Sequence, residues 1–303
     1  MLPHIHVLMA TYNGAKHLPD QLASFVTQDH KDWSLWVSDD GSTDETRDII
    51  RAFANAHPDR TVRLLEGPQS GAAANFMSLL CHPDLPNGHV ALSDQDDVWY
   101  PNKLSHALTT LQGKRGAAIY SAQSRHIDGQ GHPIGRSRPH RGQPHFANAL
   151  VQNRIAGHCA VLTPAALDLV RTVGPVDVPF HDWWLYLLMT GTGAEVLVRP
   201  DVVLDYRQHD GNVLGGNQRR LASVKRVLAV LGSTFGKWQA QNLAALETAG
   251  PVLLPENQQR LERWQSAPQW GLGRMMVSQQ IGMTRDTPLA TQLIRLAAAL
   301  GRI

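Results

Sequence analysis

The sequence predicts an α/β fold in which a mainly parallel sheet carries helices on both faces and is followed by a helical C-terminal extension. Apolar runs of strand length alternate with helix-like segments through the first half of the 303-residue chain. This alternation is typical of parallel strands joined by crossover helices. Beyond residue 216 the strand signal fades and helical periodicity takes over. We therefore expect two domains, at residues 1–215 and 216–303.

The first strand and helix are expected at the start of the chain. Residues 5–9 form a compact apolar run that stops at a polar turn, residues 11–14. Leu18, Leu22 and Phe25 then recur at the spacing of one helix face. The turn therefore lies at the carboxyl edge of the predicted sheet, where ligands of open α/β sheets bind.

The next strands repeat this arrangement. Residues 33–38 lead into a second polar turn, where Ser42 and Glu45 have capping-box spacing for a helix. Two further strands are predicted at residues 61–65 and 89–92, with a helix at residues 71–80 between them.

The second half of the chain is less regular. Residues 129–144 are rich in Gly, Pro, Arg and His and predict an exposed loop. A short strand at residues 160–162 precedes a helix opened by Thr163 and Pro164, with proline at its first position. We also expect a helix at residues 181–189, one or two strands at 195–207, and helices within 221–246 and 288–300.

Composition excludes several classes of protein. The formal net charge is only +2, so nothing favours nucleic-acid binding. The two cysteines, Cys81 and Cys159, form no CxxC pattern and the histidines form no HExxH pattern, so no zinc or redox site is indicated. We find no signal peptide and no run of about 18 apolar residues, and we expect a cytoplasmic protein.

An acidic run follows the fourth predicted strand. Asp94, Asp96 and Asp97 stand together directly after that apolar segment. Clustered carboxylates repel one another unless a cation is present, and their hard oxygen atoms suit Mg²⁺ or Mn²⁺. A solvated acidic turn explains the run equally well when the run is considered alone.

Two other strand-end turns would lie side by side if the first two strands are neighbours. They carry Thr11 and Tyr12 on one strand and Asp39 and Asp40 on the other. An aromatic ring beside a carboxylate can hold a nucleobase, because the ring stacks on the base and the carboxylate accepts an N–H from the edge of the base. Turn chemistry alone would also favour Asn-Gly and Asp-Gly pairs here.

Taken in order, these motifs resemble family 2 of the glycosyltransferases. The resemblance spans roughly residues 5–214, and it implies a GT-A fold and inversion at the anomeric carbon. The matching segments are ATYNG at 10–14, VSDDGSTD at 37–44, SDQDDVW at 93–99, HDWW at 181–184 and YRQH at 206–209.

The resemblance implies roles for individual residues. Tyr12 and Asp40 would contact the nucleobase, with Thr11 and Asp39 beside the nucleoside. Asp94 would bind the ribose or support the metal. The other implied roles are metal binding by Asp96, metal or diphosphate binding by His209, diphosphate binding by Arg207, and a supporting or sugar-binding role for Asp97.

The resemblance also implies that Asp182 is the general base that deprotonates the acceptor hydroxyl. This chain has His181 where the family has an acidic residue, which weakens that assignment. Asp182 could instead cap the helix that follows it. His158, Trp99 and Trp183 are candidate acceptor or sugar contacts, and each could equally be a core residue.

The last predicted helix carries an apolar stripe interrupted by arginines. The stripe could cover the catalytic domain, form a homodimer contact or rest on an anionic membrane. We favour packing or dimerisation over lipid contact. The stripe comprises Leu289, Leu293, Leu296, Ala297 and Leu300, and the arginines are Arg295 and Arg302.

The resemblance therefore implies an inverting, metal-dependent glycosyltransferase that looks most like the bacterial rhamnosyltransferase-like branch. We expect a dTDP- or UDP-sugar donor, with rhamnose a possible sugar, and a saccharide or lipid-linked acceptor in cell-surface polysaccharide synthesis. Two alternatives stand beside it. A nucleotidyltransferase would need a Gly-rich basic loop after the first strand, and residues 11–14 match that poorly. A catalytically inactive nucleotide-sugar-binding protein would lack an intact acidic run.

Overall fold

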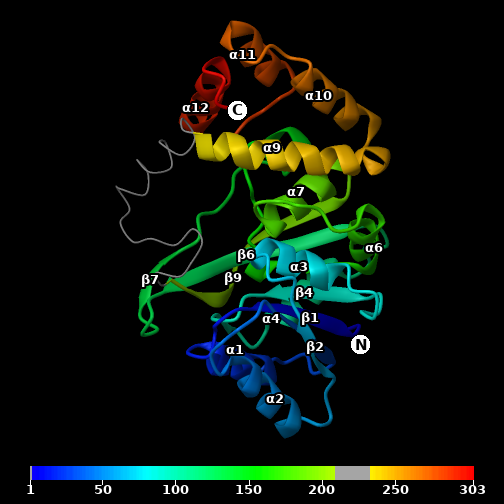
Figure 1. The fold of residues 1–303 in the computed structure, drawn as a ribbon, viewed down its shortest axis with the longest axis vertical. Coiled ribbons are helices and arrows are strands. Elements are labelled where there is room, and N and C mark those ends of the chain that lie inside the picture. The colour runs from blue at the N-terminus through cyan, green and yellow to red at the C-terminus, as the bar shows by residue number, and fades with distance from the viewer. Residues whose placement is uncertain (1, 209–232) are drawn as a thin grey trace.

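The computed structural model describes residues 2–208 and 233–303 and has an α/β architecture (Figure 1). A nine-stranded sheet forms its centre, in the order β3-β2-β1-β4-β8-β6-β9-β5, with β7 paired to β6. The strands are β1 (Ile5–Thr11), β2 (Trp33–Asp39), β3 (Val62–Glu66), β4 (His89–Ser93), β5 (Val98–Trp99), β6 (Ala118–Ile127), β7 (Pro133–Arg136), β8 (Val161–Leu162) and β9 (Glu195–Arg207).

Helices cover the sheet and continue beyond it into the C-terminal extension (Figure 1). The α-helices are α1 (Leu18–Val26), α2 (Thr46–Ala56), α3 (Ala72–Leu80), α4 (Lys103–Leu111), α5 (Phe146–Ala149), α6 (Pro164–Val173), α7 (His181–Gly191), α9 (Ser233–Thr248), α10 (Pro255–Gln265), α11 (Gly271–Gln280) and α12 (Pro288–Ala299). Two 3₁₀ turns, η1 (Gly157–Cys159) and η2 (Gly250–Val252), complete the described elements.

The first four strands of the sheet are parallel and confirm the alternating pattern. β1 pairs with both β2 and β4, and β2 pairs with β3, all in parallel. Apolar side chains line both faces because helices cover both sides of the sheet. The register places Thr11 opposite Asp39, so the first two strand-end turns are neighbours, as expected.

The rest of the sheet is mixed. β8 is antiparallel to β4 and to β6, β9 is parallel to β6, and β5 is antiparallel to β9. Residues 129–144 are not entirely a loop, because β7 lies within them and pairs with β6 as a hairpin. Residues 195–207 form one long strand, β9. The α/β fold class predicted from sequence is confirmed.

Helix starts divide into one correct and one wrong prediction. Thr163 caps α6 by accepting a hydrogen bond from the backbone N–H of Ala166. The capping box predicted for α2 is absent, since Glu45 is the N-cap residue and makes no side-chain cap bond. The hydroxyl of Ser42 instead donates to Asp39, 2.6 Å away.

The C-terminal helices share a core with the sheet domain. All residues of α7 from Trp183 to Gly191 are buried, and α7 lies between the sheet and α9 in Figure 1. Asn257 of α10 donates to the carbonyl of Gly191 at 2.9 Å. The predicted boundary at residues 215 and 216 falls outside the described residues. None of the helices in the described part is long and apolar enough to span a bilayer.

Candidate active site

Asp39 ties the first two strand-end turns together. It is fully buried. One oxygen, Oδ2, accepts from the hydroxyls of Thr11 at 2.8 Å and Ser42 at 2.6 Å. The other, Oδ1, accepts from the backbone N–H of Ser42 at 2.9 Å. A carboxylate surrounded by protein donors is stable without any ligand, so Asp39 and Thr11 fix the geometry of the predicted nucleotide side.

Asp40 organises the loop before α3 in the same way. Its two carboxylate oxygens accept the backbone N–H groups of Gln69 at 2.6 Å and Gly71 at 2.8 Å. Gln69 and Gly71 have φ values of 55° and 87°, a left-handed conformation that these charge-assisted bonds help to hold. The loop and α3 therefore border the same strand ends as Tyr12.

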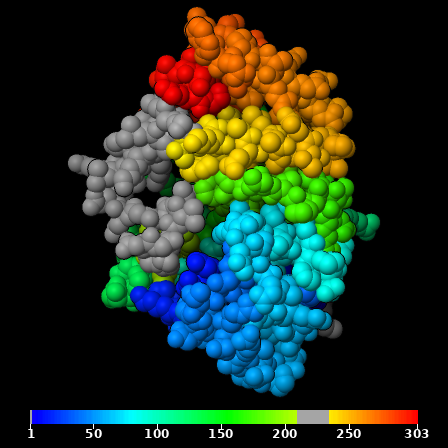
Figure 2. Space-filling model, in the orientation of Figure 1, coloured from blue at the N-terminus to red at the C-terminus, as the bar shows by residue number. Residues whose placement is uncertain are grey.

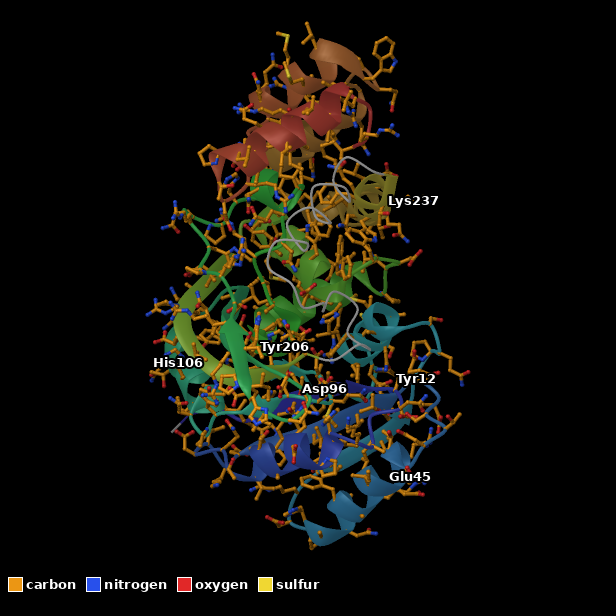
Figure 3. All side chains as sticks on the ribbon, turned by 90° about the vertical axis from the view of Figure 1, so that its left-hand side faces the viewer. Tyr12, Glu45, Asp96, His106, Tyr206 and Lys237 are labelled. Atoms are coloured by element: carbon orange, nitrogen blue, oxygen red, sulfur yellow. The ribbon has the colours of Figure 1, made fainter. Side chains whose placement is uncertain are left out.

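Tyr12 presents its ring to solvent, and Gln95 holds its backbone. The residue is 57% exposed. The Gln95 side chain accepts from the Tyr12 N–H at 2.9 Å and donates to the Tyr12 carbonyl at 2.9 Å. Nothing in the sequence pattern singles out Gln95 except its place between Asp94 and Asp96. Figure 3 shows Tyr12, Asp96 and Tyr206 across one face of the molecule.

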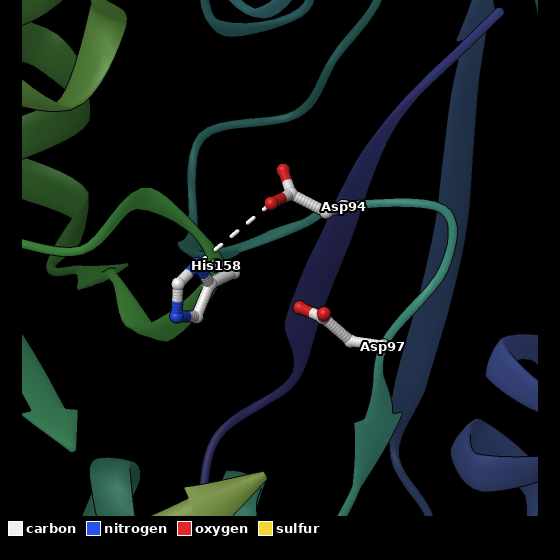
Figure 4. Close-up of side chains that lie close together, drawn as sticks. All are labelled: Asp94, Asp97 and His158. Atoms are coloured by element: carbon white, nitrogen blue, oxygen red, sulfur yellow. Dashed lines mark ion pairs between the residues drawn. The ribbon is translucent and has the colours of Figure 1, made fainter. Parts of the chain in front are cut away.

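Three side chains at the end of β4 form a group that could hold a metal ion. One ligand atom from each of Asp94, Asp97 and His158 lies within 4.8 Å of the others, and Figure 4 shows the three together. Nδ1 of His158 is 3.7 Å from Oδ2 of Asp94. Asp97 is fully buried, and its Oδ2 atom has no hydrogen-bond partner among the described residues.

The electrostatics of this group are strongly coupled. Burial raises the pKa of Asp97 well above its usual range, and the nearby charges of Asp94 and Asp96 add to this effect. Burial also acts to raise the pKa of Asp94, but pairing with His158 outweighs it and the net shift is downward. The pKa of His158 is raised despite burial, because Cys159 and Asp94 favour its charged form. His158 thus acts as the counter-ion of Asp94.

Arg207 fastens the acidic run to the end of β9. Its guanidinium donates to the carbonyl of Asp96 at 3.0 Å and to Asp20 at 3.1 Å, and its backbone N–H donates to Asp97 at 3.3 Å. The side chain is buried. Asp96, predicted as a metal ligand, is not part of the group above, where Asp97 and His158 lie instead. His209 falls outside the described residues.

A buried lysine lies close to the acidic run. Lys103 is fully buried, and its Nζ atom is 3.0 Å from the centre of the Trp99 ring. Within the described chain its ammonium has no hydrogen-bond partner. Burial lowers the pKa of Lys103 to about 7, against the opposing effect of Cys159, Asp97 and Asp94. Trp99 is 2% exposed, so its ring is covered by protein, and the acceptor or sugar contact suggested for it stays a prediction.

Asp182 and His181 open α7 at the same end of the sheet. Asp182 is half-buried, and it accepts backbone N–H groups from Trp183 at 2.7 Å and Gly157 at 3.3 Å. It is not the helix cap, because Phe180 occupies the N-cap position. His181 stacks on Phe76 with ring centres 4.0 Å apart. Burial lowers the pKa of His181, which favours the neutral form of the residue that stands where the family has an acid.

Trp183 belongs to the core. It is 4% exposed, and its indole N–H donates to the carbonyl of Ala149 at 2.7 Å. Its ring packs against Phe235 of α9, with centres 5.6 Å apart. The Trp183 ring is therefore covered by protein, and the acceptor contact suggested for it stays a prediction.

The turn η1 joins the predicted base to the acidic group. Gly157 donates its N–H to Asp182, and the next residue, His158, pairs with Asp94. The close approach requires glycine, since a Cβ at position 157 would lie 2.4 Å from Nε2 of His181. Through Gln95 the same strand end reaches Tyr12. The structure therefore brings the predicted base, acidic run and aromatic ring to one place.

Comparison with known proteins identifies the family. A family model described as glycosyl transferase family 2 matches residues 6–166, more than half of the chain. The chain belongs to glycosyltransferase family 2. The dTDP-rhamnosyl transferase RfbG of Shigella flexneri is 28% identical to it over 252 residues, covering 80% of this chain and 84% of that protein.

Two further similarities bear on this glycosyltransferase. An Escherichia coli protein, the UDP-Glc:alpha-D-GlcNAc-diphosphoundecaprenol beta-1,3-glucosyltransferase WfgD, is 28% identical over 108 residues, covering 35% of this chain and 40% of that protein. The mannosyltransferase PcManGT of Pyrobaculum calidifontis, solved with GDP-Man and Mn²⁺, superposes with a TM-score of 0.57 at 18% identity. It covers 100% of this chain and 87% of that one, which shows the GT-A fold.

The residues of this glycosyltransferase fit a divalent cation. Two carboxylates and an imidazole are ligands that Mn²⁺ accepts, and Mg²⁺ favours the oxygen atoms among them. The unpartnered Oδ2 atom of buried Asp97 is a polar atom that a cation would satisfy. His158 would hold such a cation through a neutral ring nitrogen, and its Nδ1 atom already lies 3.7 Å from Oδ2 of Asp94.

Proposed function

We propose that this glycosyltransferase is an inverting, metal-dependent enzyme that uses a dTDP- or UDP-sugar, with dTDP-rhamnose as the first candidate. The acceptor is a saccharide or lipid-linked saccharide of cell-surface polysaccharide synthesis, reached from the cytoplasm. The choice of donor is supported by the similarity to RfbG, which extends over most of both chains. The lipid-linked acceptor is supported by the name of WfgD.

One observation carries the proposal. The 3₁₀ turn η1 contacts both the proposed base and the cation-binding group. The N–H of Gly157 donates a hydrogen bond to Asp182, and His158 pairs with Asp94. A single displacement needs a base on one side of the anomeric carbon and a leaving diphosphate on the other. A carboxylate and a cation-binding group fixed to one short turn meet this requirement.

The protein side chains have distinct tasks in this reaction. Asp182 accepts the proton of the acceptor hydroxyl as that oxygen bonds to the anomeric carbon and the bond to the nucleoside diphosphate breaks. A bound Mg²⁺ or Mn²⁺ supplies positive charge that stabilises the departing diphosphate. Asp94, Asp97 and His158 are the residues that would hold it, with Asp96 and His209 as the further ligands proposed from sequence.

The nucleoside has its own side of the site. Tyr12 offers an exposed ring for stacking. Asp40 lies on the neighbouring strand end, where its backbone N–H donates to the carbonyl of Thr11 at 2.8 Å. The buried pair of Thr11 and Asp39 joins the two strand ends that carry Tyr12 and Asp40. Gln95 fixes the Tyr12 backbone. Arg207 acts on the diphosphate through the acidic run that it holds in place.

A substitution of the proposed base tests the function. Sugar transfer from dTDP-rhamnose, and from UDP-sugars as alternatives, is measured with Mn²⁺ for the native chain and for Asp182→Asn. Loss of a general base lowers kcat by about 10²–10⁴-fold. Thermal shifts with dTDP should remain, because Asp182 does not touch the nucleoside side.

The exposed carboxylate Asp59 provides the matched control. Asp59→Asn removes the same charge from the surface and should keep full turnover. Full turnover of Asp182→Asn would instead disprove the base assignment, and an absence of transfer from every dTDP- and UDP-sugar would disprove the donor class.

A further inference from the structure

The exposed large apolar side chains of the described residues gather at one end of the molecule. Two of the eight, Tyr12 and Ile134, lie elsewhere. The other six belong to α11, α12 and the residues beside them, and we refer to them as the apolar tip. They are Trp270 (75% exposed), Leu272 (70%), Met276 (53%), Leu289 (72%), Leu296 (47%) and Leu300 (56%).

The leucines of the apolar tip on α12 are not the residues through which this helix packs on the core. α12 buries Ile294, Ala297 and Ala298 against the shared core. Leu289, Leu296 and Leu300 are spaced by seven and four residues, so they lie on a second, outward face of the same helix. The sequence favoured packing or dimerisation for this stripe, and packing against the catalytic domain accounts for only part of it.

The two helices contribute to one continuous surface. A Cβ at Gly301 would lie 3.2 Å from the Cβ of Trp270, so the end of α12 touches the start of α11. Figures 1 and 2 show both helices at the end of the long axis farthest from α2. A surface at an extremity can meet a flat partner without a clash from the rest of the molecule.

The segment that carries the apolar tip has an excess of positive charge. Residues 270–303 contain Arg274, Arg285, Arg295 and Arg302, against a single acid, Asp286. Asp286 faces the catalytic domain, where it pairs with Arg154 at 2.8 Å and with His140 at 2.8 Å. The acid is thus engaged away from the surface. Arg274 is buried over the Trp264 ring, whereas Arg285, Arg295 and Arg302 reach solvent at least in part. Arg302, beside the contact with Trp270, is exposed.

These features favour an anionic partner over a second copy of the chain. A two-fold interface brings the same patch together with itself, which would place one set of arginines opposite its equal. An anionic lipid surface instead pairs arginines with phosphates and accepts the leucines at the acyl boundary. An exposed tryptophan is typical of the membrane–water interface.

We propose that the apolar tip binds the surface of an anionic lipid membrane. Trp270, Leu289 and Leu296 enter the headgroup boundary, while Arg302 and Arg295 lie at the level of the lipid phosphates. This binding is independent of the proposed reaction and holds whichever sugar is transferred.

Vesicle binding by the full chain tests the proposal. Flotation is measured with vesicles of phosphatidylglycerol and phosphatidylcholine, and with phosphatidylcholine alone. We expect binding to the anionic vesicles that weakens as salt is added. The triple variant Leu289→Ser, Leu296→Ser, Leu300→Ser should bind roughly tenfold or more weakly, because it removes the inserting side chains.

Two controls separate a loss of lipid insertion from misfolding and from a general loss of surface hydrophobicity. The three leucines are exposed, so the triple variant should fold, and circular dichroism and thermal unfolding check this. Ile134→Ser changes an exposed apolar residue on β7, away from the apolar tip, and should bind like the native chain. Unchanged binding by the triple variant, or no binding of the native chain to anionic vesicles, would overturn the proposal.

Sedimentation velocity without lipid distinguishes the second copy. We expect the native chain and the triple variant to have the same mass. A native dimer that the triple variant converts to monomers would assign the apolar tip to self-association and contradict membrane binding.

Discussion

The two sides of the candidate site differ in how their buried polar groups are satisfied. On the nucleoside side, both carboxylate oxygens of Asp39 and of Asp40 accept hydrogen bonds from the protein itself. On the cation side, Asp97 Oδ2, Lys103 Nζ and His181 Nε2 are buried and have no hydrogen-bond partner within the described ranges.

This difference separates a preformed half from a half that a ligand completes. A buried polar group left without a partner costs about 1–3 kcal/mol. The nucleoside side therefore contributes to the stability of the free protein, whereas the cation side reduces it. Substitutions that remove one carboxylate should have opposite effects on stability in the two halves, and four predictions test this contrast.

Asp97→Asn should cause the largest change. Activity falls on the order of 10²-fold or more because a proposed metal ligand is lost. Stability without metal rises, since burial and the nearby Asp94 and Asp96 raise the pKa of the Asp97 carboxyl, and a group that ionises less readily in the folded state lowers stability at neutral pH. Transfer rates with Mn²⁺ and the Tm of the metal-free protein measure the two effects, with Asp59→Asn as the control. If Mn²⁺ raises the Tm of the variant as much as that of the native chain, Asp97 is not a ligand.

Asp39→Asn should act in the opposite direction on stability. Asp39 now accepts hydrogen bonds from Thr11 and Ser42. In the variant the side-chain amide nitrogen of asparagine, itself a donor, faces one of these donor groups and the bond is lost. We expect a loss of about 1–3 kcal/mol in the free energy of unfolding, measured by urea denaturation. A variant as stable as the native chain would show that the nucleoside side is not preformed by these bonds.

Gln95→Leu should weaken the contact between the acidic run on the cation side and Tyr12 on the nucleoside side. It removes both bonds to the Tyr12 backbone, and we expect a loss of about 1 kcal/mol in stability. The KM for the donor should rise with little change in kcat, because the Tyr12 ring is less fixed. Gln130→Leu, in an exposed loop, is the control. An unchanged KM would mean that Tyr12 does not depend on Gln95.

Asp44 should show the smallest effect, in acid. Burial acts to raise its pKa, but hydrogen bonds from Thr46 and from the Ala15 N–H outweigh it and lower the pKa below the usual 3.8. A lowered pKa in the folded state adds stability above pH 3.8 that is lost as the pH falls through the folded value. Asp44→Asn should therefore flatten the decline of Tm below that pH. Parallel curves for the variant and the native chain would contradict this.

The parallel half of the fold was predictable because its strands are short apolar runs between turns. β1 to β4 and α1 to α3 agree with the sequence pattern to within a few residues. β6 escaped prediction although it lies at the centre of the mixed half. Its buried positions include Ser121, Gln123 and Ser124, so polar side chains interrupt the apolar pattern that marks a buried strand.

The candidate site was predictable in part for a related reason. Asp94 and Asp97 belong to one short acidic run, and their motif is visible in the sequence. His158 reaches them only through tertiary structure, because the antiparallel pairing of β8 with β4 returns η1 to the end of β4. The roles of Lys103 and Gln95 likewise arise from contacts across the fold, to Trp99 and Tyr12.

The burial of α7 constrains how the C-terminal extension of this chain can be replaced by that of a relative. Its first turn carries Asp182, and its last residues, Thr190 and Gly191, are held by Asn257 of the extension. A Cβ at Gly191 would lie 2.7 Å from a methyl carbon of Leu253. The C-terminal extension therefore cannot be exchanged without changing its interface with α7. A chimaera would keep its catalytic helix in register only if the residues on both sides of this contact were inherited together.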